Sequence, residues 1–159
     1  DNLGDWSSDV CSSDLFLQLE EIEQALYQLK NEIVYIHNSL PDIFMSVGSK
    51  GTKPIGDIFK RVSILLYEHE VESVHEGFKK ALNENKKQLN LKKYDIDILL
   101  NLSKSLGESD IEGQQNILTL TIRNIKSQLD SAKNVMEKNI KMYRYLGFSF
   151  GAILVIMML

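Results

Sequence analysis

The last third of the chain carries an apolar seam with the repeat of one long helix. Its members are spaced 4, 3, 4, 3, 4 and 7 residues apart: Leu118, Ile122, Ile125, Leu129, Ala132, Met136 and Tyr143. Such a heptad seam packs against antiparallel neighbours or forms a coiled coil. Ser109, followed three residues later by Glu112, has the pattern of a capping box that starts a helix. Both prolines, Pro41 and Pro54, lie far upstream, so no proline interrupts this helix.

Shorter segments upstream repeat apolar residues with the same helical period. This spacing predicts helices over about residues 16–37, 41–47 and 73–87. Another helix is expected to open at residues 52–54, and one more to be capped by Asn90 and ended by Gly107. With only nine glycines and two prolines, the composition argues against a many-turned β-protein. We predict an all-α bundle of five to six helices, the last of them long.

The first fifteen residues have neither a helical period nor strand alternation. The stretch 4–15 back-translates in one frame into a widely used sequencing-library adapter, so we interpret residues 1–15 as a disordered, adapter-derived artefact; a disordered acidic tail is the alternative. Their four aspartates account for the whole net charge of −4, which leaves a neutral body. A neutral body argues against a protein that binds polyanions by bulk electrostatics. Cys11 is the single cysteine, which excludes an intramolecular disulfide framework.

The end of the chain differs from the rest. Residues 146–159 contain no charged side chain. As a helix they span about 22 Å, short of the roughly 30 Å of a hydrocarbon core. Three interpretations are open: a terminal membrane anchor, a buried core helix, or a peripheral or partner-binding segment. Six basic residues against two acidic ones in 123–144 favour the anchor. We therefore expect a helical bundle over 16–144 in the cytoplasm and a C-terminal transmembrane helix over 145–159.

Two glycines in this tail have the spacing of a helix-packing motif. Gly147 and Gly151 are four residues apart, which lets a second helix approach closely in a membrane. The pattern is also common by chance, because membrane helices tolerate glycine. We name the two glycines as candidates for membrane-helix packing.

The sequence offers little for catalysis. Glu72 and His75 match one Glu-x-x-His unit of a di-metal bundle, but such a site needs a second unit and the chain has none. No cysteine nucleophile lies after residue 15, and no phosphate-binding glycine loop is present. We predict a protein that is not an enzyme and needs no cofactor or metal. A binding or scaffolding role is the class that remains.

Charged side chains gather in two places in the middle of the chain. Four acidic residues lie at the ends of the expected third and fourth helices: Glu68, Glu70, Glu72 and Glu76. They form a candidate docking patch for a basic partner; a merely solvated loop is the alternative. Three lysine pairs follow at 79–80, 86–87 and 92–93. Acidic residues interleave with them (Glu76, Glu84, Asp95 and Asp97), so we interpret the lysines as a solvated face and expect no nucleic-acid binding.

Three segments together resemble one protein family. The first, 25–44, is an amphipathic helix that runs into Ser-Leu-Pro. The second, 106–117, has the pattern LGxxDxxxQxxxI, with Leu106, Gly107, Asp110 and Gln114 as its marked residues. The third is the uncharged C-terminal segment. In this order and spacing they resemble the stage III sporulation protein AB family of endospore-forming bacteria, over about residues 17–159.

The resemblance implies a function that periodicity does not show. The family's helical domain is similar to the cytoplasmic domain of the type II secretion platform protein F. It is expected at the outer forespore membrane, facing the mother-cell cytoplasm, within the channel that joins the two cells. Expected partners are the cytosolic secretion-type ATPase of the same operon, other channel membrane subunits, membrane lipid and a second copy. Family members also carry an N-terminal membrane segment, which we expect to be missing here.

Two interpretations remain open from the sequence. The chain is a non-enzymatic platform subunit, or alternatively a generic membrane-tethered adaptor for protein interactions. The LGxxDxxxQ residues clamp a helix hairpin, or alternatively present a partner contact at an exposed corner. In the clamp, Gly107 ends one helix and Ser109 or Asp110 supplies oxygens to the free N–H groups of the next.

Overall fold

A computed structural model describes the backbone of residues 2–159 and the side chains of 13–159 except 136, 139, 140 and 143. The described backbone folds into six helices: α1 (Asn2–Tyr35), α2 (Leu40–Lys50), α3 (Ile55–Tyr67), α4 (Val74–Glu84), α5 (Lys93–Glu108) and α6 (Ile111–Met158). The predicted all-α bundle with a long last helix is confirmed.

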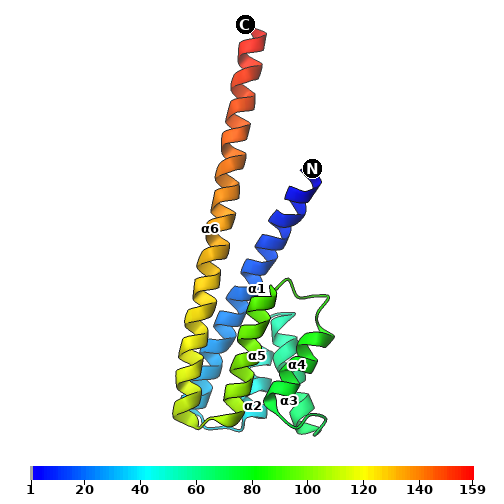
Figure 1. Cartoon of the computed structure of the whole chain (residues 1–159), viewed down its shortest axis with the longest axis vertical. Helices are drawn as coiled ribbons and strands as arrows, with labels where there is room; N and C mark the ends of the chain where they lie inside the picture. The colour runs from blue at the N-terminus through cyan, green and yellow to red at the C-terminus, as the bar shows by residue number, and fades with distance from the viewer. Residues whose placement is uncertain (1) are drawn as a thin grey trace.

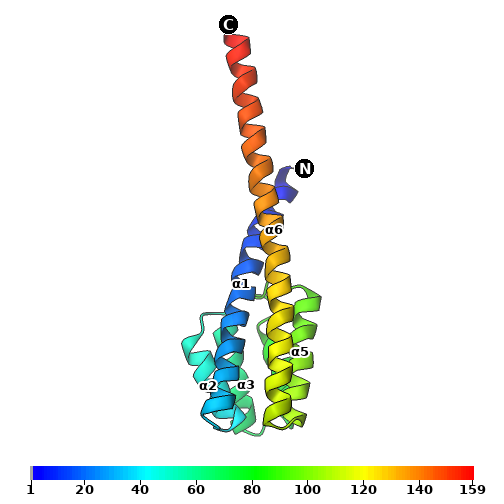
Figure 2. The same ribbon diagram turned by 90° about the vertical axis from the view of Figure 1, so that its left-hand side faces the viewer.

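The helices form a closed ring. Each helix packs against its neighbours in the sequence, and α6 returns to pack against α1. Figures 1 and 2 show α1 and α6 side by side and antiparallel, with both termini directed away from the same end of the bundle. α6 extends farther than α1 in this direction (Figure 1).

The contact between α1 and α6 is built from the apolar seam. Leu118, Ile122, Ile125 and Leu129 are buried, and so are Leu19, Ile22, Leu26, Leu29 and Ile33 of α1. Ala132 packs at the margin of this core. The seam is thus confirmed as far as residue 132, whereas the side chains of Met136 and Tyr143 lie outside the described residues. Beyond residue 132, every described side chain of α6 is exposed.

Three phenylalanines form the centre of the core between α2, α3 and α4. Phe44, Phe59 and Phe78 come from α2, α3 and α4 and are almost fully buried. Phe78 stands edge-on to both of the others, with ring centroids 5.4 Å from Phe44 and 5.5 Å from Phe59. Edge-to-face packing of aromatic rings adds to the stability that burial of their apolar area already provides. The cluster therefore ties three short helices together.

Several predicted helix ends differ from the structure. α1 begins at Asn2 rather than near residue 16, whereas the interpretation of residues 1–15 as an adapter-derived artefact stays a prediction. Extending an existing helix costs far less than nucleating one, which explains why a sequence without a helical period continues α1. α4 ends at Glu84, three residues early, where the side-chain amide of Asn85 donates to the Ala81 carbonyl oxygen (2.9 Å). Lys92, rather than Asn90, is the residue that precedes α5.

The C-terminal part of α6 requires a further correction. Among the helices in the described part of the chain, none combines the length and apolar character needed to cross a membrane. The expected transmembrane helix over 145–159 is therefore not supported. The alternative of a buried core helix is wrong, because these residues are exposed; Phe148 is 82% and Met158 90% accessible. α6 passes residue 145 without a break.

We predict that Phe78→Ala lowers the free energy of unfolding by about 3–5 kcal/mol, because it removes a ring from a packed aromatic cluster. Phe148→Ala is the matched control, since the same side chain is deleted from the exposed end of α6. The control should change stability by less than about 0.5 kcal/mol. Chemical denaturation followed by circular dichroism measures both. Equal effects of the two substitutions would contradict the described core.

Candidate functional site

The LGxxDxxxQ residues lie at the junction of α5 and α6, in the last turn of one helix and the first turn of the next. Asp110 precedes α6, and its Oδ1 accepts a hydrogen bond from the Gly113 N–H at 2.8 Å. Its carbonyl oxygen also accepts from the Gln114 N–H at 2.8 Å. Asp110 is thus the N-cap residue, rather than the Ser109 of the predicted capping box. A carboxylate at this position also interacts favourably with the partial positive charge of the helix N-terminus.

Gln114 connects the two helices of this hairpin. Its side-chain Nε2 donates to the carbonyl oxygen of Leu106, in the last turn of α5, at 2.8 Å. Leu106 itself is 1% exposed and belongs to the core. A helix end leaves carbonyl groups without intrahelical partners, and Gln114 supplies one. These contacts are what the helix-hairpin clamp requires.

Gly107 does not have the predicted role. It lies within α5, which continues to Glu108, and its φ is not positive. A Cβ at this position would meet side-chain atoms of Val74 at 3.7–3.8 Å, which is ordinary van der Waals contact. The prediction that Gly107 ends the helix is therefore wrong. The helix ends one residue later, at Glu108, and the N–H of the following Ser109 donates to the Ser105 carbonyl oxygen (3.0 Å).

The four acidic candidates lie around the turn between α3 and α4 and are all exposed. Glu70 is engaged within the molecule: its Oε2 lies 3.1 Å from Lys80 Nζ and 3.8 Å from an Arg61 nitrogen. The hydrogen bond from Lys80 holds the pKa of Glu70 below its ordinary value. Glu76 Oε2 accepts from the Glu72 N–H at 3.0 Å. This surface is therefore partly neutralised by intramolecular partners.

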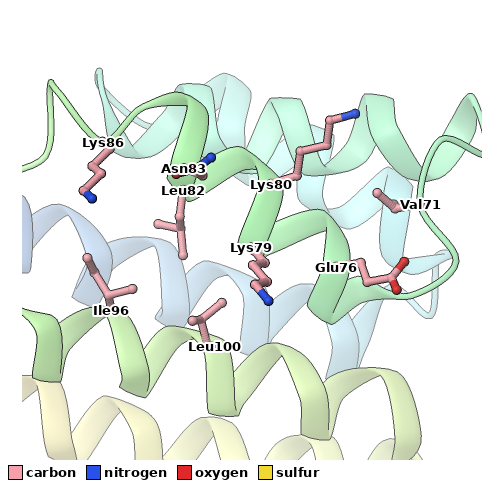
Figure 3. A pocket seen from close by; sticks show the side chains of 9 residues that line it. All are labelled: Val71, Glu76, Lys79, Lys80, Leu82, Asn83, Lys86, Ile96 and Leu100. Atoms are coloured by element: carbon pink, nitrogen blue, oxygen red, sulfur yellow. The ribbon is translucent and has the colours of Figure 1, made fainter.

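A groove that the sequence did not reveal lies between α4 and α5 (Figure 3). It encloses about 660 Å³. Its apolar lining consists of Val71, Leu82, Ile96 and Leu100, and its polar lining consists of Glu76, Lys79, Lys80, Asn83 and Lys86. Figure 3 shows Lys79 and Lys86 pointing toward α5, with Leu82, Ile96 and Leu100 between them. The sequence shows only that Ile96 and Leu100 are four residues apart and so share one face of a helix. The groove arises because α4 packs beside this face.

Two of the acids that interleave with the lysines turn away from them. Glu84 forms a bidentate pair with Arg61, at 2.9 Å to Nε and 3.3 Å to Nη2. This hydrogen bond raises the pKa of Arg61. Asp95 is 1% exposed, and its Oδ2 accepts from the Lys92 N–H at 3.0 Å. Its Oδ1 has no partner among the described residues, and burial raises the pKa of this carboxyl group. The six lysines are exposed, as in a solvated face, but these two acids bond to Arg61 and to a backbone N–H rather than to the lysine ammonium groups.

His75 and Glu72 do not come together as ligands. The Nδ1 of His75 lies 3.2 Å from the Leu100 carbonyl oxygen and 3.3 Å from Ser103 Oγ, both on α5. The described residues contain no group of three or more His, Cys, Asp or Glu side chains placed to hold a metal ion. His75 therefore contributes to the contact between α4 and α5.

The candidate packing glycines lie on the exposed end of α6. A Cβ at Gly147 or Gly151 would meet no atom within 4 Å. Within the described chain, nothing packs against this face. Their use in helix packing stays a prediction about an assembly.

Comparisons with known proteins agree on one family. Residues 13–159 match the family described as Stage III sporulation protein AB. The stage III sporulation protein AB of Bacillus subtilis (strain 168) is 25% identical over 142 residues, which cover 89% of this chain and 82% of that protein. A solved structure of a stage III sporulation protein AB superposes with a TM-score of 0.71 and 22% identity, over 78% of this chain and 97% of the other. At this identity the superposition shows a common fold.

The hairpin clamp has a direct test in Gln114→Ala. Removal of the amide leaves the Leu106 carbonyl without this donor, so we expect a loss of about 1–2 kcal/mol in the free energy of unfolding. Gln115→Ala is the matched control, because the neighbouring side chain is exposed. Thermal and chemical unfolding give both values. If the two variants were equally stable, the clamp would have no energetic weight and the motif would need another role.

Proposed function

The chain belongs to the stage III sporulation protein AB family, and from this we propose that it is a non-enzymatic platform subunit of the channel between mother cell and forespore. The bundle docks a cytosolic secretion-type ATPase of the same operon. The end of α6 holds the bundle at the outer forespore membrane, on the mother-cell side. Other membrane subunits of the channel are the remaining partners.

The observation that carries the proposal is the contrast between the two parts of α6. The helix has 48 residues and is about 72 Å long. Its first part packs in the bundle core, whereas its last fourteen residues are uncharged and exposed. An apolar surface of this kind in water is costly and marks an interaction site. Lipid is the cover that we propose.

Charge along α6 supports a membrane on this side. The exposed residues that precede the uncharged end include Lys138, Lys141 and Arg144. Basic side chains next to an apolar segment are attracted by anionic lipid headgroups. The uncharged segment is too short to cross a bilayer of ordinary thickness, so we propose that it enters the membrane without a complete span.

The bundle itself provides the docking part. Its helices form a closed ring around one core, so it moves as a unit when a partner pulls or turns it. Because α6 belongs to that core and also forms the tether, motion of a docked ATPase is passed to the membrane through one helix. This mechanical role needs no catalytic group.

The proposal is tested by a binding titration between the full chain in lipid nanodiscs and the secretion-type ATPase from the same operon. We expect saturable binding in the micromolar range that persists at moderate salt. An unrelated hexameric ATPase serves as the control and should not bind. Absence of saturable binding, with both proteins folded by circular dichroism, would contradict the docking role.

A further inference from the structure

The groove between α4 and α5 has the features of a docking site that the bundle leaves empty. Val71, Ile96 and Leu100 of its apolar lining are each partly exposed, whereas Leu82 of α4 is buried. Ile96 and Leu100 are one helical turn apart on the same face of α5. Partly exposed apolar residues in a groove between two helices are typical of sites that bind the apolar face of an amphipathic helix.

The rim of the groove is positively charged. Lys79 and Lys86 form no ion pair with any described residue, since the ion pairs of this region join Arg61, Lys80, Glu70 and Glu84. Glu76 is the single acid of the lining, and its Oε2 is already engaged by the Glu72 N–H. Asp95, although adjacent in sequence to the groove, is buried and turned to Lys92. Two free ammonium groups therefore flank an apolar floor.

The chemistry of this groove selects its occupant. A nucleic acid would meet an apolar floor and a neutral body, which lack the dense positive charge that phosphates require. A small ligand would find flexible lysines rather than fixed, convergent polar groups. An acidic amphipathic helix satisfies both parts, because its apolar stripe covers Ile96 and Leu100 while its carboxylates reach Lys79 and Lys86.

We propose that the groove between α4 and α5 binds an acidic amphipathic helix of a protein partner. The inference deepens the proposed function and rests on it for the identity of that partner, the secretion-type ATPase. It also places the docking site away from the acidic candidates around the α3–α4 turn, of which only Glu76 lines the groove. The opposite charges would speed association and set the direction of the bound helix.

The test uses the full chain and fluorescein-labelled synthetic helices of sixteen residues. One helix carries a leucine stripe flanked by glutamates, the second has lysines in place of the glutamates, and the third has serines in place of the leucines. Fluorescence anisotropy should show at least tenfold tighter binding of the first, with weakening at higher salt. Equal affinity for the glutamate and lysine helices would overturn the proposal.

A matched pair of charge reversals locates the binding. The double variant Lys79→Glu, Lys86→Glu should weaken the glutamate helix at least tenfold. Lys104→Glu is the control, because this exposed lysine of α5 lies outside the groove lining, and it should stay within twofold of the parent chain. All altered side chains are exposed, so folding is retained, and unfolding midpoints verify this. An undiminished affinity of the double variant would overturn the proposal.

The same variants separate this inference from the proposed function. An ATPase that binds the parent chain and the double variant equally well would leave the platform role standing and overturn the groove as its docking site. A glutamate helix that binds the groove, together with an ATPase that binds neither chain, would support the site and contradict the platform role.

Discussion

The packing of α6 against α1 is the interaction on which the rest of the structure depends. It joins the last helix to the first, and so closes a ring whose other contacts are between neighbours in the sequence, apart from a smaller contact between α1 and α3. Leu118, Ile122, Ile125 and Leu129 form the α6 side of this contact. Burial of each such side chain contributes about 2 kcal/mol. Without it, α2 to α5 would form an open layer with an uncovered apolar face.

The same contact gives α6 its double character. One part of the helix is fixed by the core, and the continuation projects beyond the bundle with its side chains exposed (Figure 1). A helix held on one side over four turns is a lever for whatever binds its far end. In the proposed function the far end meets lipid and the bundle meets a motor protein. The α4–α5 groove lies away from the α1–α6 contact in this ring, so a partner there would leave the lever free.

Patterns within one helix could be predicted from the sequence, and contacts between helices could not. The apolar seam and the helix count followed from the 3.6-residue period, which backbone geometry imposes. The cap at Asp110 was shifted by one residue, because Ser109 and Asp110 both have the chemistry of an N-cap. Gly107 was misassigned because a glycine near a helix end need not be its C′ residue: here its φ is not positive and α5 continues to Glu108.

The groove shows the limit of sequence reasoning most clearly. In the sequence, Glu84 and Asp95 interleave with the lysines around them. In the fold, Glu84 turns to Arg61 of α3 and Asp95 is buried at the start of α5, so the charge balance of the surface differs from that of the sequence. At the C-terminal segment, the lack of charge could be seen in the sequence alone. The transmembrane helix predicted from it is not supported, because no described helix combines the required length and apolar character.

The central claim is that α6 runs as one rigid helix from the bundle to its tip, and a spin-label distance tests this most directly. Labels at Leu120→Cys and Leu154→Cys, in a Cys11→Ser background, would occupy two exposed positions on the clamped and projecting parts of α6. A continuous helix predicts a narrow distance distribution centred at about 51 Å in lipid vesicles. A broad distribution, or one centred well below that distance, would reveal a hinge and contradict the transmission of motion through α6.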